Sequence, residues 1–268
     1  MKKIICKMLV VAAAVAMASA CAPKAHKIQI TAHRGFWKCE EAQFAENSIK
    51  SLALAQEHGL WGSEFDIRLT SDSIVVVNHN EDFHGLVVID HTYAELQEFK
   101  LENGEKLPTL DDYLTQGEKS DKTVLVVELK PMKSQELDEL LTQKTLAALK
   151  AHNLYDPKRA IFISFSKYIS DRIAELAPEF TNQYLGGEIA PDDLVKDGIN
   201  GIDYHFSVFD KNPGWIEQAR AHDMSINVWT VNDSTDIQRM IDFGVDCITT
   251  NEPLRVRGML DGNEFVIK

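Results

Sequence analysis

Short apolar runs alternate with amphipathic stretches along most of the chain. Runs rich in β-branched residues predict strands, and they lie at residues 28–32, 62–69, 123–129, 160–165, 182–185, 201–204, 226–230 and 246–249. Apolar residues at helical spacing predict helices at residues 48–57, 110–114, 136–151, 168–176, 191–196, 213–221 and 235–243. About eight strand–helix repeats in a chain of this length predict an α/β fold, a (β/α)₈ TIM barrel.

One stretch interrupts the repeats. Residues 71–107 contain a β-branched run at 74–78 and a short helical pattern at 93–99, so we interpret them as a small insertion after the second strand. An open doubly wound sheet is the alternative fold, but it usually has a glycine-rich first turn, which is absent here. No low-complexity tract or linker divides the remaining chain, so residues 28–268 are expected to form one catalytic domain.

The first 27 residues resemble a targeting segment. A basic start is followed by an apolar run too short to remain in a bilayer, which predicts a signal peptide over residues 1–20 and a linker over residues 21–27. The Ala-Ser-Ala-Cys sequence resembles a bacterial lipoprotein processing site with Cys21 as the acylated residue. We therefore expect an exported protein of the bacterial periplasm or outer membrane, with a freely secreted soluble protein as the alternative.

Charge and cysteine content narrow the possible partners. The formal net charge of −13 argues against nucleic acid, because phosphate backbones are bound by clustered Lys and Arg. Besides Cys21 and Cys6 of the signal segment, the chain has Cys39 and Cys247. These two fall near opposite ends of neighbouring predicted strands, so we expect free thiols.

Chemically distinctive side chains gather where the predicted strands end. In a barrel, catalytic groups lie at the C-terminal ends of the strands, and residues two apart on a strand share a face. The side chains at these positions are His33, Glu64, Asp66, Glu128, Lys130 and Trp229.

The three carboxylates suggest a metal site. Glu64, Asp66 and Glu128 come from adjacent strands, and oxygen ligands suit a divalent cation such as Mg²⁺ or Ca²⁺. Burying three acids without a cation would be costly. In the alternative interpretation, Asp66 or Glu128 forms an ion pair with Arg68 or Lys130.

The order of motifs resembles the glycerophosphodiester phosphodiesterase family. That family carries His-Arg-Gly, Glu-Asn-Thr, Glu-x-Asp, Thr-x-Asp, His-Asp, Ile-Pro-Thr-Leu, Glu-x-Lys and two closing motifs. The matching segments span residues 30–253 and are His33-Arg34-Gly35, Glu46-Asn47-Ser48, Glu64-Phe65-Asp66, Thr70-Ser71-Asp72, His79-Asn80, Leu107-Pro108-Thr109-Leu110, Glu128-Leu129-Lys130, Trp229-Thr230-Val231-Asn232 and Gly244-Val245-Asp246.

The resemblance implies metal-dependent hydrolysis of a small-molecule glycerophosphodiester to glycerol phosphate and an alcohol. Carried over by position, His33 and His79 would form the general acid–base pair, with the acid and the base unassigned. The metal would be held by Glu64, Asp66 and Glu128. Arg34 and Lys130 would bind phosphate oxygens, and Trp229 would pack on the glycerol carbons.

Several single residues have a simpler structural interpretation. Arg34 could pair with an acid of the site, and Glu46 is expected to be structural, beside Asn47 as the helix N-cap. Trp229 could equally be a barrel-packing residue. The remaining histidines are expected to be ordinary surface or loop residues, with His84 and His205 as the candidate exceptions.

The chain departs from the family pattern near the expected position of the leaving alcohol. Asn80 replaces the usual Asp, residues 81–85 lack the family's Arg-Thr-Thr-Gly sequence, and the 36–45 loop is longer and more acidic. We therefore expect the reaction type to be retained with an unusual head group.

Three rival functions remain open from the sequence. A lysophospholipase D-like phospholipid phosphodiesterase would use the same chemistry at a membrane. A retaining glycosidase would use Glu64 and Glu128, but it leaves Asp66 and both histidines without roles. A surface-binding lipoprotein without catalysis is the third.

Overall fold

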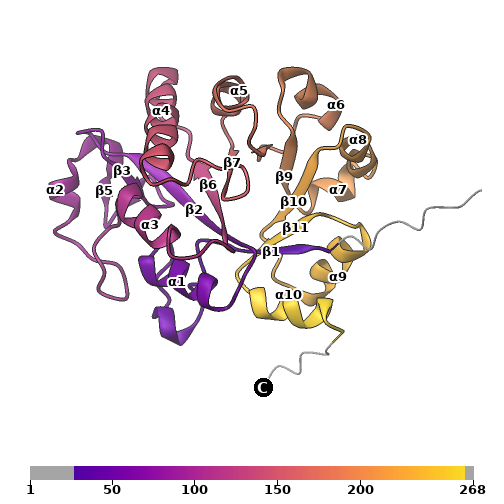
Figure 1. Ribbon diagram of the computed structural model, residues 1–268, viewed down its shortest axis with the longest axis horizontal. Coiled ribbons are helices and arrows are strands. Elements are labelled where there is room, and N and C mark those ends of the chain that lie inside the picture. The colour runs from indigo at the N-terminus through magenta and orange to yellow at the C-terminus, as the bar shows by residue number, and fades with distance from the viewer. Residues whose placement is uncertain (1–26, 263–268) are drawn as a thin grey trace, which may run out of the picture.

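Eight parallel strands close into a barrel in the computed structural model, which describes residues 27–262 (Figure 1). Closure follows from the pairing of the first strand with both the second and the last. The barrel strands are β1 (Gln29–Ala32), β2 (Gly62–Leu69), β6 (Val124–Leu129), β7 (Ala160–Ser164), β8 (Asn182–Tyr184), β9 (Gly201–His205), β10 (Ser225–Trp229) and β11 (Cys247–Thr250). The predicted (β/α)₈ barrel is confirmed.

Helices surround the barrel, as Figure 1 shows. They are α1 (Ile49–Glu57), α3 (Leu110–Gly117), α4 (Gln135–Ala151), α5 (Lys167–Leu176), α6 (Pro191–Leu194), α7 (Val208–Lys211), α8 (Trp215–Ala221), α9 (Ser234–Asp242) and α10 (Pro253–Leu260), with short 3₁₀ turns at η1 (Glu40–Ala42) and η3 (Val195–Asp197). The pattern missed α10, which starts directly after the last strand with Pro253 in its first turn. None of the helices within residues 27–262 is both long and apolar enough to cross a bilayer.

Apolar side chains fill both sides of the barrel wall. Val126, Ile161, Ile163 and Leu185 pack in a cluster with Trp229, and because residues two apart share a strand face, this cluster lies on the same face as Glu128. Two larger clusters contain the opposite strand faces and the helices. This rigid double layer carries the loops at the C-terminal ends of the strands.

The insertion, residues 71–107, folds against the end of the barrel where the strands have their C-termini. It contains β3 (Val75–Val77), β4 (Asp82–Phe83), β5 (Leu86–Val87), η2 (Val88–Asp90) and α2 (Tyr93–Leu96). Strand β3 pairs antiparallel with the last three residues of β2, and a small apolar cluster that includes Val76, Phe83 and Leu107 holds the rest. His79 lies in the loop between β3 and β4, so this insertion carries one of the predicted catalytic residues.

The predicted N-cap of α1 was wrong, because Asn47 does not cap the helix. Ser48 is the N-cap, and its hydroxyl accepts the Ser51 backbone N–H at 3.0 Å. Asn47 instead has φ of 55°, a left-handed conformation that Asn tolerates better than most residues. Its side chain bonds to β2: Nδ2 donates to Asp66 Oδ2 at 2.8 Å, and Oδ1 accepts the Asp66 backbone N–H at 3.2 Å.

Both described cysteines are free, as expected. Cys39 lies in the loop after β1, and Cys247 starts β11, where its Sγ is 3.1 Å from Thr31 Oγ1. The signal peptide, the linker up to residue 26 and the acylated Cys21 lie outside the described residues.

The insertion is tied to the barrel through the first turn of α1. The Glu105 carboxylate accepts the backbone N–H groups of Ile49 at 2.8 Å and Lys50 at 3.1 Å. An acidic group at a helix N-terminus satisfies N–H groups that have no partner within the helix and opposes the positive end of the helix dipole.

We predict that Glu105→Ala lowers the free energy of unfolding by about 1 kcal/mol, the usual cost of losing such a cap. For a domain of this size that corresponds to a melting temperature about 2–4 °C lower. Thermal denaturation followed by circular dichroism measures it. The control is Glu102→Ala, an exposed residue of the same loop; equal melting temperatures for the two variants would contradict the role of Glu105.

Candidate active site

Three buried carboxylates meet where β2 and β6 lie side by side, on the inner part of β2 and near the C-terminal end of β6. Asp66 and Glu128 are direct partners in the parallel register of these strands, and Glu64 shares the strand face of Asp66. One oxygen from each of Glu64, Asp66 and Glu128 lies within 4.8 Å of the others. Their relative exposures are 2, 1 and 7 %. The predicted grouping of three acids is present, and it could hold a metal ion.

The protonation of these acids reflects burial and mutual repulsion. Burial, with the charges of Asp66 and Glu128, raises the pKa of Glu64 well above its usual value. Burial and the Asp66 charge raise the pKa of Glu128 to about 7. Burial would raise the pKa of Asp66 as well, but the Lys130 ammonium and the Asn47 amide lower it overall. The three acids therefore favour a cation or a proton in their midst.

Lys130 is the cation that faces two of these carboxylates. Its Nζ lies 2.8 Å from Asp66 Oδ1 and 2.6 Å from Glu128 Oε1, so the ion-pair interpretation is correct for Lys130. Arg68 instead donates from Nε and Nη2 to the backbone oxygen of His79, at 3.1 and 2.9 Å. Glu64 Oε1 is buried without a hydrogen-bond partner among the described residues, and such an oxygen suits a metal ligand.

A tight backbone turn explains the His-Arg-Gly sequence. Arg34 and Gly35 both have positive φ, 56° and 76°, and this turn directs the Arg34 backbone N–H to Glu64 Oε2 at 2.8 Å. A Cβ at position 35 would lie 2.2 Å from the Ser51 Oγ, so only glycine fits against α1. The Arg34 guanidinium pairs with Glu46 at 2.8 Å and lies 3.8 Å from Asp66. Glu46 thus holds Arg34 beside the site.

Each of the two histidines bonds through Nδ1 to an asparagine. His33 Nδ1 is 2.8 Å from Asn251 Oδ1, and His79 Nδ1 is 2.9 Å from Asn80 Oδ1. Because an amide oxygen only accepts hydrogen bonds, Nδ1 carries the proton in each ring. Nε2 is therefore the atom left to exchange a proton with a ligand.

Burial is the main cause that keeps both imidazoles neutral. It lowers the pKa of His33 to about 4, with the Arg34 charge acting in the same direction. It also lowers the pKa of His79.

One cavity brings together most of the predicted residues. It has a volume of about 220 Å³, and Ile163, Phe165, Leu185 and Trp229 form its apolar wall. The Trp229 indole is fixed by its Nε1–H, which donates to the Asp203 backbone oxygen at 2.9 Å. The predicted residues that line this cavity are His33, Arg34, Glu64, His79, Glu128, Lys130 and Trp229.

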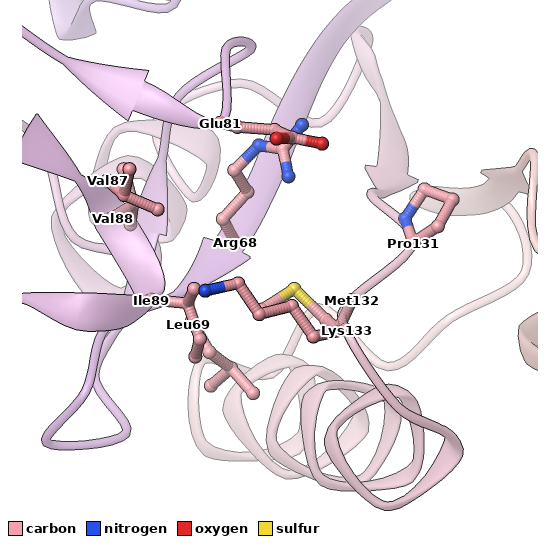
Figure 2. Close-up of a pocket in the computed structure, with 9 residues that line it drawn as sticks. All are labelled: Arg68, Leu69, Glu81, Val87, Val88, Ile89, Pro131, Met132 and Lys133. Atoms are coloured by element: carbon pink, nitrogen blue, oxygen red, sulfur yellow. The ribbon is translucent and has the colours of Figure 1, made fainter. Parts of the chain in front are cut away.

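A second cavity, of about 140 Å³, lies between the insertion and the loop after β6 (Figure 2). Arg68 and Glu81 lie beside each other in this view, while Val87, Val88 and Ile89 form its aliphatic side. Because Arg68 also holds the His79 carbonyl, this cavity adjoins the catalytic candidates.

Three residues near the predicted set were missed or misassigned. Asn251 follows the last strand, and the rule that strand ends carry function could have found it. Asn47 was taken for a helix cap, although it holds Asp66. Asp203 is a single acid within the apolar run of β9, and this isolated acid is the sequence feature that could have identified it. Of the other histidines, His205 packs against Trp229 with ring centroids 5.2 Å apart, and His84 stacks on Phe99 in the insertion.

Comparisons with known proteins agree with this geometry. The Glycerophosphoryl diester phosphodiesterase family matches residues 33–255. A glycerophosphodiester phosphodiesterase from Caldanaerobacter subterraneus subsp. tengcongensis is 29 % identical over 244 residues, covering 85 % of this chain and 95 % of the relative.

Solved structures show the same fold. A glycerophosphodiester phosphodiesterase from Parabacteroides distasonis is similar with a TM-score of 0.85 and 39 % identity, over 88 % of this chain and 97 % of the other. A phosphodiesterase from Oleispira antarctica in complex with the product sn-glycerol-3-phosphate has a TM-score of 0.74 and 24 % identity, over 87 % of this chain and 96 % of the other. The chain therefore belongs to the glycerophosphodiester phosphodiesterase family and is a phosphoric diester hydrolase.

Proposed function

We propose that this protein hydrolyses glycerophosphodiesters to glycerol phosphate and an alcohol, in a reaction that depends on a divalent cation and two histidines. The observation that carries this proposal is the cavity, where Glu64 and Glu128 lie beside two neutral imidazoles and two cationic side chains, with Asp66 directly behind them within metal-ligand distance of both. Family membership supports the substrate class and removes the glycosidase alternative.

The carboxylates fit a hard cation. Glu64, Asp66 and Glu128 offer oxygen ligands only, which suits Mg²⁺ or Ca²⁺. When bound, the cation neutralises charge on the phosphoryl oxygens and orients the diester. It would also offset the repulsion that raises the pKa of Glu64 and Glu128.

The histidines supply the proton transfers in this proposal. His33 and His79 each present Nε2 once Nδ1 is bonded to an asparagine. One ring removes a proton from the attacking oxygen, and the other protonates the leaving alkoxide. Arg34 and Lys130 bind the non-bridging oxygens, which carry negative charge throughout the reaction.

The two arms of the diester would occupy opposite sides of this centre. The glycerol packs on Trp229, and the product complex of the Oleispira antarctica relative, with glycerol phosphate bound, supports that product here. The alcohol faces the second cavity beyond His79. None of the residues lining that cavity is aromatic, whereas quaternary ammonium groups are usually held by aromatic rings.

The location is part of the proposal. Cys21 would be acylated after removal of residues 1–20 and would anchor the exported enzyme in a bacterial membrane, with a soluble secreted form as the alternative. Metabolic labelling with a fatty acid, compared with a Cys21→Ser variant, tests the anchor.

Chelation and metal restoration test the proposed function. A chelator should abolish hydrolysis of glycerophosphodiesters, and adding back Mg²⁺ or Ca²⁺ should restore it, because the carboxylates must hold a cation. The chelator should also lower the melting temperature, by more at pH 8 than at pH 6. The fall is larger at pH 8 because the pKa of Glu128 is raised to about 7. At pH 6 a proton on Glu128 relieves the repulsion among the carboxylates of the metal-free protein, and at pH 8 this proton is lost.

The control for this experiment is Glu128→Gln, which should lose the thermal response to metal. Unchanged turnover and unchanged melting temperature after chelation would show that the three carboxylates do not form a metal site.

Asn251 is expected to orient His33. Asn251→Leu removes the acceptor of the Nδ1 proton and should lower kcat about 10- to 100-fold, a typical loss for a residue that supports an active-site histidine. Asn251→Asp keeps an acceptor and should retain more activity, with the pH profile moved upward because a carboxylate stabilises the imidazolium. Lys38→Ala, in the same loop region, is the control; equal kcat values for Asn251→Leu and wild type would refute the assignment.

The second cavity predicts head-group selectivity. In an assay of choline, ethanolamine, inositol and glycerol esters of glycerophosphate, the rates should differ, and the choline ester should not be the fastest. Comparison of kcat/KM across the panel measures this. Equal values would mean that the second cavity does not contact the alcohol.

A further inference from the structure

An acid of β9 reaches the active-site cavity and has no role in the proposed reaction. Asp203 lines the same cavity as Glu64, Glu128 and Lys130, and its relative exposure is 0 %. Neither carboxyl oxygen has a hydrogen-bond partner among the described residues. A buried polar group without a partner costs about 1–3 kcal/mol, so a ligand that satisfies it would bind with a corresponding advantage.

The polar neighbours of Asp203 satisfy little of its hydrogen-bonding capacity, because they pair mainly among themselves. Asn227 is its register partner on β10 and its amide opposes the rise of the Asp203 pKa, but the Asn227 Nδ2 makes its geometrically good bond to Thr249 Oγ1 at 3.0 Å. Further round the barrel, Thr31 pairs with Cys247. The carboxyl group therefore remains available to whatever enters the cavity.

The surroundings of Asp203 indicate the chemistry of that ligand. Its own backbone oxygen accepts the Trp229 indole N–H, so the aromatic ring and the carboxyl group lie next to each other in the cavity wall. Leu185 and Ile163 complete the apolar side. A glycerol unit has the complementary form, with carbon-bound hydrogens for the ring and hydroxyl groups for the carboxyl.

Burial and the Glu128 charge raise the pKa of Asp203 well above its usual value. A neutral carboxyl group both donates and accepts a hydrogen bond, which suits hydroxyl groups and gives no attraction for a cationic group.

We propose that Asp203 is a specificity residue that hydrogen-bonds the secondary (C2) hydroxyl of the glycerol arm of the substrate. This inference rests on the proposed function, and it names the part of the substrate that the wall around Trp229 recognises. A site built to bond a hydroxyl discriminates strongly against an analogue that lacks it, because the protein group then stays buried and unpaired.

The experiment compares three diesters with the metal-loaded enzyme. The first is a glycerophosphodiester, the second is the same diester with 3-hydroxypropyl in place of glycerol, and the third is bis(4-nitrophenyl) phosphate, which has no hydroxyl group. The variant is Asp203→Leu, which keeps roughly the size of the side chain and removes both hydrogen-bonding oxygens. We expect it to lower kcat/KM about 10- to 100-fold on the glycerol diester, and to change it less than about twofold on the nitrophenyl diester.

The pattern across substrates separates recognition from folding. The preference of the wild type for the glycerol diester over the hydroxypropyl diester should shrink in Asp203→Leu, even if the glycerol hydroxyl also serves as the nucleophile. Asp138→Leu is the matched control, a buried carboxyl group outside the cavity, and it should leave the preference unchanged. Melting temperatures verify that both variants fold.

Each other outcome overturns the inference. An equal loss on all three diesters would show a structural role, and an unchanged preference would show that Asp203 does not contact the hydroxyl. If Asp203→Leu does not fold, a wild type that fails to prefer glycerol over hydroxypropyl is sufficient to refute the inference. A wild type that is active on bis(4-nitrophenyl) phosphate alone refutes the glycerol recognition and the proposed substrate together, whereas an unchanged preference in the variant refutes only the role of Asp203 and leaves the proposed function intact.

Discussion

The constraint on which this site depends is the burial of like charges on neighbouring strands. Parallel register places Asp66 opposite Glu128, and the strand period adds Glu64 to the same face. Water cannot screen these groups, so their repulsion must be offset by cations or protons. Lys130 offsets part of it through contacts with two of the acids. The loops, turns and asparagine contacts around the site hold their side chains in position about these three carboxylates.

Backbone contacts, rather than side-chain ion pairs, set much of the geometry. The turn at Arg34 and Gly35 brings a peptide N–H to Glu64, and Asn47 bonds to both the side chain and the backbone of Asp66. These short polar contacts fix the acids without adding charge. They also explain why two of the family motifs contain a glycine and an asparagine, residues that tolerate positive φ.

The pattern of the sequence predicted the barrel because strand and helix periods are local properties. The β2 range was predicted with both ends correct, and the strand-end residues lie together because the C-terminal ends of parallel strands share one rim. The pattern could not distinguish Ser48 from Asn47 as the N-cap, since both residue types cap helices and only the contact with Asp66 separates them. Asn251 and Asp203 were missed for a different reason. Their importance depends on the hydrogen-bond partner that each has, or lacks, across the barrel, and the local spacing of residues in the sequence does not predict such contacts.

The anchoring of α1 by Glu105 has a consequence for how the chain can vary. The insertion carries His79, while the helix that Glu105 caps begins next to the loop carrying Arg34 and Glu46. Two segments that contribute residues to the same cavity are thus joined through the Glu105 carboxylate. A deletion at this contact would therefore displace the residues that both segments contribute.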